Sequence, residues 1–113
     1  MAELDIAARS VDGVPLLALV GRIDVGTAPE LRRRLQEHLR EEAPRLILDL
    51  SGVEYMDTGG LATLIEAQLT VQERQGKLVV IGLSDRIRGV FSIGHVVDMF
   101  TVVEGEEQLN GLL

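Results

Sequence analysis

The chain has 113 residues, 46% of them apolar, and this size fits one domain with a single buried core. It has no cysteine, which excludes disulfides, thiol catalysis and cysteine-based metal sites. Its formal net charge of −7 repels phosphate backbones and anionic lipids, so we expect neither nucleic-acid binding nor membrane insertion. No apolar run reaches the ~18 residues of a membrane span and no basic-then-apolar leader opens the chain, so we expect a cytoplasmic protein.

Periodicity and turn signals predict strands that alternate with helices. Asp12-Gly13 is a hairpin signal between the first two strands, and Thr27 and Ser84 are candidate helix caps. In chain order we expect strands over 4–8 and 15–20, a helix over 28–41, a strand over 46–50, a connection over 51–57, a helix over 58–75, a strand over 78–81, a helix between 84 and 94, a strand over 101–103 and a helix over 106–113. This order predicts an α/β fold: a mixed β-sheet with an N-terminal hairpin, a parallel centre and covering α-helices.

Each predicted helix has an apolar face that we expect to pack against the sheet. The expected core residues are Leu31, Leu35 and Leu39 in the first helix, Leu61, Leu64, Ile65 and Leu69 in the second, Ile87, Val90 and Phe91 in the third, and Leu109, Leu112 and Leu113 in the last. Glu30 stands at the capping-box position of the first helix, and Gly76 is the expected stop of the second.

Two turns follow the carboxyl ends of predicted parallel strands, where α/β sheets usually place function: 21–27 and 51–60. The second contains Asp57-Thr58-Gly59-Gly60, an acid, a hydroxyl and two glycines at the start of a helix. One interpretation is structural, with Thr58 or Asp57 as helix cap. The other is that Thr58 accepts a phosphoryl group, whose charge of about −1.5 to −2 suits a helix N-terminus and acts on any protein docked there.

Several segments resemble successive blocks of the STAS domain family (sulfate transporter and anti-sigma factor antagonist). They are Gly21-Arg22-Ile23-Asp24, Leu46-Ile47-Leu48-Asp49-Leu50-Ser51, Met56-Asp57-Thr58-Gly59-Gly60-Leu61 and, resembling the family's late helix, Ser84-Asp85-Arg86-Ile87-Arg88-Gly89-Val90-Phe91. The resemblance covers nearly the whole chain and implies a single STAS domain over 1–113 with the STAS-type mixed sheet. The length favours the bacterial anti-sigma factor antagonist branch of the family.

The resemblance implies a regulatory switch and no enzymatic activity. In this family, an anti-sigma factor that is also a serine/threonine kinase phosphorylates the Ser or Thr after the motif's Asp. The unmodified antagonist binds that kinase and so releases a sigma factor, whereas the phosphorylated antagonist dissociates until a phosphatase resets it. By position, Thr58 is the expected phosphoacceptor, and Asp24, Asp57, Gly59 and Gly60 belong with it to the partner-binding face. Gly59 departs from the family pattern, which commonly has a second Ser or Thr there.

Other functions have less support in the sequence. A structural or scaffold subunit of a stress-signalling or lipid-transport ATPase complex, bound without modification, stays as the alternative. A phosphate-receiver domain is rejected because the single lysine, Lys77, begins a strand and no acid pair follows the first strand. The two histidines are far apart in sequence, so no metal or other cofactor is expected. We expect a monomer or weak dimer, since the first strand leaves a free sheet edge.

Overall fold

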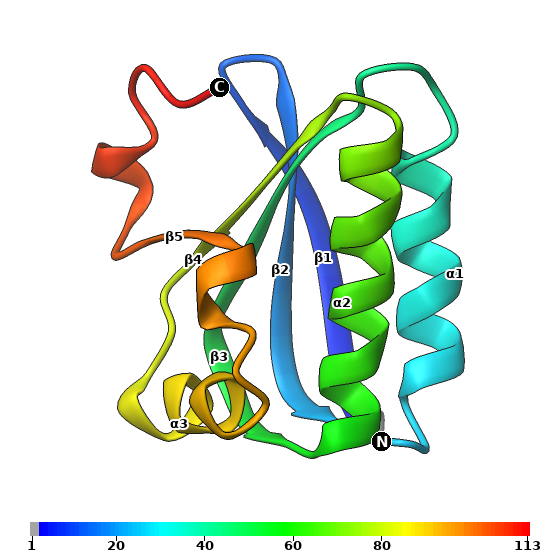
Figure 1. The fold of residues 1–113 in the computed structure, drawn as a ribbon, viewed down its shortest axis with the longest axis vertical. Coiled ribbons are helices and arrows are strands. Elements are labelled where there is room, and N and C mark those ends of the chain that lie inside the picture. Colours follow the sequence, from blue (N-terminus) through cyan, green and yellow to red (C-terminus); the bar gives the residue numbers. More distant parts are fainter. Residues whose placement is uncertain (1–2) are drawn as a thin grey trace.

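The computed structural model describes residues 3–113, which form one five-stranded sheet with α-helices packed on it (Figure 1). The strands are β1 (Leu4–Val11), β2 (Val14–Ile23), β3 (Arg45–Met56), β4 (Lys77–Ile81) and β5 (Thr101–Val103); the α-helices are α1 (Ala28–His38), α2 (Thr58–Glu73) and α3 (Asp85–Ile93); two short 3-10 helices are η1 (Val97–Met99) and η2 (Glu106–Gln108). The strand order is β1-β2-β3-β4-β5. β1 is antiparallel to β2 and the other pairs are parallel, which confirms the predicted mixed sheet.

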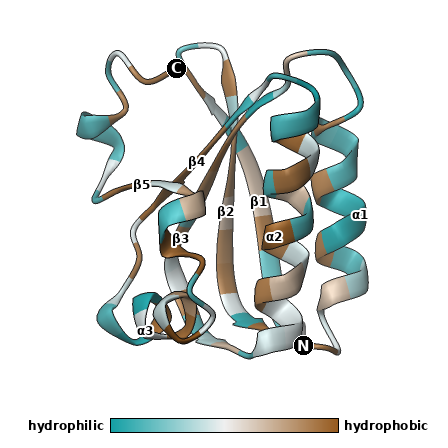
Figure 2. Cartoon of the chain, in the orientation of Figure 1, coloured by the Kyte–Doolittle hydropathy of each residue, from teal (hydrophilic) through white to brown (hydrophobic). Residues whose placement is uncertain are grey.

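Different segments pack on the two faces of the sheet. The larger apolar cluster joins one face to α1, α2 and α3, and it includes Leu17, Leu19, Leu48, Leu31, Leu64, Ile87 and Phe91. On the other face, a smaller cluster of Val14, Leu16, Ile47, Val79 and Ile81 is closed by Leu109 from the C-terminal segment. Figure 2 shows apolar residues along the central strands and mostly hydrophilic residues along the outer helix α1.

The predicted hairpin is confirmed at Asp12-Gly13. Both residues have positive φ angles, 51° and 81°, and Val11 pairs with Val14 across the loop. Two successive left-handed residues give a two-residue turn whose twist matches that of the flanking strands. The hairpin therefore sets the register of β1 on β2, which continues without a break to Leu4 and Gly21.

Both strands that lead to the predicted functional turns are longer than expected. We predicted that 21–26 would end the second strand and that 51–57 would be a connection; instead β2 runs to Ile23 and β3 to Met56. The two extensions pair with each other in parallel, with register shifts between Ala18 and Val20 and between Gly21 and Arg22. These irregularities hid the strands from a search for regular alternation.

Two predicted helices are shorter than expected, for different reasons. α1 ends at His38, and the Arg40 carbonyl accepts a hydrogen bond from the Arg74 guanidinium (2.8 Å) at the end of α2. The predicted helix over 106–113 is wrong beyond the short η2, since Gly111 has a φ of 84°. With this backbone conformation, Gly111 cannot be part of a right-handed helix.

Two details of α2 also differ from the sequence expectation. Leu69 is 49% exposed, whereas the buried face continues through Ala67 and Val71. α2 ends at Glu73, and the left-handed position after it is Gln75, with a φ of 59°, so Gly76 is not the residue that ends the helix. The third helix follows its prediction, with the Ser84 hydroxyl accepting a hydrogen bond from the Ile87 amide.

None of the helices within residues 3–113 combines the length and the apolar character that are needed to cross a membrane.

Candidate functional site

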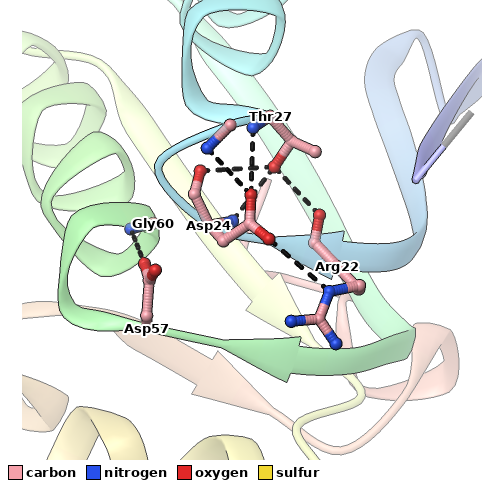
Figure 3. Close-up of polar contacts among 6 residues, drawn as sticks. Arg22, Asp24, Thr27, Asp57 and Gly60 are labelled. Carbon is pink, nitrogen blue, oxygen red and sulfur yellow. Dashed lines mark hydrogen bonds and ion pairs between the residues drawn. The ribbon is translucent and has the colours of Figure 1, made fainter.

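Parallel pairing brings the two predicted turns together at one end of the sheet. Ile23 of β2 pairs with Met56 of β3, so the next residues, Asp24 and Asp57, begin neighbouring turns. The Asp57 amide donates a hydrogen bond to the Ile23 carbonyl (3.2 Å), which joins the turns directly. Figure 3 shows the result, with the two carboxylates on adjacent loops that lead into α1 and α2.

The turn between β2 and α1 is built around Asp24. One oxygen of its carboxylate accepts hydrogen bonds from the amides of Gly26 (2.9 Å) and Thr27 (3.1 Å) (Figure 3). The Thr27 hydroxyl donates to the Arg22 carbonyl (2.9 Å) and accepts from the Asp24 amide (3.0 Å). The prediction that Thr27 caps α1 with its side chain is therefore wrong: its hydroxyl closes the turn instead.

The turn between β3 and α2 gives different tasks to Asp57 and Thr58. Asp57 is the N-cap, and its carboxylate accepts a hydrogen bond from the Gly60 amide (2.7 Å). Thr58 is the first residue of α2 and is exposed. Within residues 3–113, no group hydrogen-bonds to the Thr58 hydroxyl. Of the two residues that could cap this helix, Asp57 does so, and the hydroxyl of Thr58 stays available to other molecules.

The two glycines after Thr58 have unequal surroundings. A Cβ on Gly60 would lie 2.3 Å from the Ile23 carbonyl oxygen, so only glycine lets α2 start this close to β2. A Cβ on Gly59 would lie 3.3 Å from an Asp57 carboxylate oxygen and 3.7 Å from the Val25 Cβ. Gly60 is thus a packing requirement, whereas Gly59 keeps the surface low between Val25 and Thr58.

Three further residues of this surface were missed by the sequence reasoning. The Arg22 guanidinium lies 4.1 Å from the centre of the Tyr55 ring, and its Nε is 3.5 Å from an Asp24 carboxylate oxygen. Val25 is 76% exposed beside them. A strand interpretation of 51–56 would have placed Tyr55 beside Arg22, with which it is in register. We call the surface made by these three residues with Asp24, Asp57, Thr58 and Gly59 the turn face.

Other charged and titratable candidates lie away from the turn face. The basic run 32–34 forms ion pairs on the helix surface: Arg33 contacts Glu30 (2.6 Å) and Glu37 (2.7 Å). The Glu30 carboxylate accepts a hydrogen bond from Arg33, and this contact lowers its pKa. Glu30 does not complete a capping box, because the Thr27 amide donates to Asp24 instead. His95 has a φ of 57° and shapes the turn after α3. No group of three or more His, Cys, Asp or Glu side chains able to hold a metal occurs in the described part of the chain.

The comparisons with known proteins agree with this architecture. The chain matches the family model of the STAS domain over residues 5–109. It is 33% identical to the anti-sigma-B factor antagonist of Listeria monocytogenes, over 96% of this chain and 95% of that protein. It is 30% identical to the anti-sigma-B factor antagonist of Staphylococcus aureus, over 93% of this chain and 97% of that protein.

Solved structures with the same fold include anti-sigma factor antagonists. The antagonist from Mycobacterium paratuberculosis superposes with a TM-score of 0.84 at 22% identity, covering 96% of this chain and 92% of that one. Unphosphorylated SpoIIAA superposes with a TM-score of 0.72 at 16% identity, covering 94% of each chain.

Proposed function

Because the chain belongs to the STAS domain family, we propose that it is an anti-sigma factor antagonist, a regulatory protein and not an enzyme. Its turn face binds an anti-sigma factor that is also a serine/threonine kinase, and this binding releases a sigma factor. Phosphorylation of Thr58 ends the interaction. The observation that carries the proposal is the exposed Thr58 hydroxyl at the start of α2, in a chain whose relatives over nearly their full length are named anti-sigma-B factor antagonists.

The turn face has the rigidity and composition that a protein partner needs. Hydrogen bonds from two backbone amides hold the Asp24 carboxylate, and Asp57 is held by the Gly60 amide. A partner therefore orders few groups when it binds. Val25 and Tyr55 supply exposed apolar surface, at 76% and 38% exposure, beside these fixed charges.

The chemistry of the switch needs groups from both proteins. The kinase supplies ATP with Mg²⁺, and the Thr58 Oγ1 attacks the γ-phosphorus. A bond forms between Oγ1 and phosphorus, the bond to the β-phosphate oxygen breaks, and ADP leaves. The kinase also supplies the base that takes the hydroxyl proton.

A phosphate on Thr58 is compatible with the fold and opposes rebinding. It lies at the positive end of the α2 dipole, and within the described residues the amides of Thr58 and Gly59 have no acceptor. The new charge of about −1.5 to −2 adds to the carboxylates of Asp24 and Asp57 on the same face. It also occupies the space above Gly59. Its bulk, and its repulsion from acidic groups of the bound kinase, both favour dissociation. A phosphatase that removes the group resets the switch.

The test is a pull-down from host extract with three baits: wild type, Thr58→Asp and Thr58→Val. Valine keeps the branched shape of threonine but has no hydroxyl, so it is the matched control. We expect wild type and Thr58→Val to retain a protein with a serine/threonine kinase domain, identified by mass spectrometry, and Thr58→Asp to lose it. Retention of one complex by all three baits would contradict the switch and favour the unmodified scaffold or lipid-transport ATPase subunit.

A further inference from the structure

We propose that β1 is a dimerisation edge, which pairs antiparallel with β1 of a second copy of this chain about a two-fold axis at Ala7. The inference concerns the outer edge of the sheet, so it does not depend on the proposed phosphorylation of Thr58. It rests on the unprotected edge, on the direction of its backbone groups and on the order of its charges.

The β1 edge lacks most of the features that usually protect an edge strand, and its two charged residues, Asp5 and Arg9, have opposite signs. It is eight residues long, LDIAARSV, and has no proline, lysine or glycine. Its register on β2 is continuous from Leu4 to Val11, so no bulge twists it away. Within residues 3–113 no strand lies on its outer side, because β1 is the first strand of the order. Long, regular and unblocked edges of this kind are templates for another strand.

The backbone groups that point outward belong to the even-numbered residues. The Glu3 carbonyl accepts a hydrogen bond from the Arg22 amide (2.8 Å), and the Val11–Val14 pair closes the two-residue hairpin. Odd-numbered residues therefore direct their amides and carbonyls toward β2. Since the direction alternates along an antiparallel strand, Leu4, Ile6, Ala8 and Ser10 direct theirs outward.

Charge then selects one register for a second copy. With the axis at Ala7, Asp5 lies opposite Arg9 of the second copy, and Arg9 lies opposite Asp5 of the second copy. An axis at Ile6 sets Asp5 opposite Ala7 and Arg9 opposite Glu3, which precedes β1. An axis at Ala8 sets Arg9 opposite Ala7 and Asp5 opposite Val11, and axes at Asp5 or Arg9 place like charges together. Only the axis at Ala7 therefore sets both charged residues of β1 opposite a residue of opposite charge. The chosen register also sets even residues opposite even residues, Ile6 with Ala8 and Leu4 with Ser10, which the outward backbone groups require.

The side chains at the centre of the proposed pairing are compatible with close approach. Ala7 and Ala8 are exposed in the single chain. The small methyl group of Ala7 fits the short separation of the non-hydrogen-bonded pair that it forms with Ala7 of the second copy. Arg9 forms an ion pair with Glu106, yet its side chain is still 49% exposed. Because a guanidinium has five donors, Arg9 can contact both Glu106 and Asp5 of the second copy.

Cysteine scanning tests the register directly, since the chain has no cysteine of its own. In the proposed dimer, two Cys residues at position 7 face each other across the axis, within disulfide range. Two Cys residues at position 10 are six residues apart along the strands, about 20 Å. Under mild oxidation we expect Ala7→Cys to form disulfide-linked dimers at least about tenfold faster than the equally exposed Ser10→Cys. Equal rates would overturn the proposal, because random collisions give that result.

Two further variants separate strand pairing from chance proximity. Ala8→Pro removes an outward amide that β1 does not use within the chain, so circular dichroism should show a folded protein. Added to Ala7→Cys, it should abolish the preferential cross-link. Asp5→Arg should slow the cross-link, and Asp5→Arg with Arg9→Asp should restore it, because the exchange restores opposite charges across the axis. A folded Ala7→Cys/Ala8→Pro protein that cross-links as fast as Ala7→Cys would also overturn the pairing.

Discussion

At the residue scale, the central feature is the division of tasks between Asp57 and Thr58. Sequence alone allowed either residue to cap α2, and the structure gives the cap to Asp57, at 2.7 Å from the Gly60 amide. The Thr58 side chain therefore makes no capping hydrogen bond that phosphorylation would break. A phosphate added to Thr58 leaves the cap in place, so the proposed switch changes the surface and not the fold.

The adjacent glycines provide a matched pair for a residue-scale prediction. Gly60→Ala should lower the free energy of unfolding by at least about 2 kcal/mol, because its Cβ meets the rigid Ile23 backbone at 2.3 Å. Gly59→Ala should stay within about 1 kcal/mol of wild type, since its contact at 3.3 Å is with a side-chain oxygen and alanine favours the helix. Urea unfolding measures both, and equal stabilities would contradict the close approach of α2 to β2.

At the element scale, the order of strands and helices could be predicted because it depends on local signals. The Asp12-Gly13 hairpin, the Ser84 cap and the apolar run of β4 each identify an element without reference to the rest of the chain. The end of β3 and the end of α1 could not be predicted in this way. The end of β3 depends on pairing with β2, and the end of α1 depends on a hydrogen bond from Arg74. Both ends therefore follow from the tertiary structure.

The same distinction explains which site residues the sequence predicted. Asp24 and Asp57 were found because each begins a turn after a strand, and the structure places them on neighbouring loops (Figure 3). Arg22 and Tyr55 were missed because their contact at 4.1 Å depends on the irregular register between β2 and β3. Val25 was missed because exposed apolar residues give no periodic signal in a turn.

The corrected face of α2 gives an element-scale prediction with its own control. Leu64 is fully buried, so Leu64→Ala should lower the free energy of unfolding by about 2–5 kcal/mol. Leu69 was predicted to be buried but is 49% exposed. Leu69→Ala should therefore lower the free energy of unfolding by less than about 0.5 kcal/mol. The urea concentrations at the unfolding midpoint are compared between each variant and wild type, provided that the dependence of the unfolding free energy on urea concentration stays the same. A large loss for Leu69→Ala would instead support the buried face first expected from the sequence.

At the scale of the whole molecule, the two proposed interfaces use different parts of the sheet. The turn face lies at the carboxyl ends of β2 and β3, whereas the dimer edge runs along β1 (Figure 1). The chain carries a net charge of −7, and a phosphate on Thr58 makes it more negative. Because Thr58 lies on the turn face and not on β1, its phosphorylation can release the anti-sigma factor without changing the backbone groups along the β1 edge.

The most direct measurement of the proposed switch uses the kinase recovered by pull-down. It is bound to immobilised wild-type chain or to Thr58→Val, and its dissociation is followed by biolayer interferometry before and after addition of ATP with Mg²⁺. We predict that ATP raises the dissociation rate from wild type by at least about tenfold and leaves Thr58→Val unchanged. Wild type that stays bound after ATP, or release of both proteins at the same rate, would contradict a switch at Thr58.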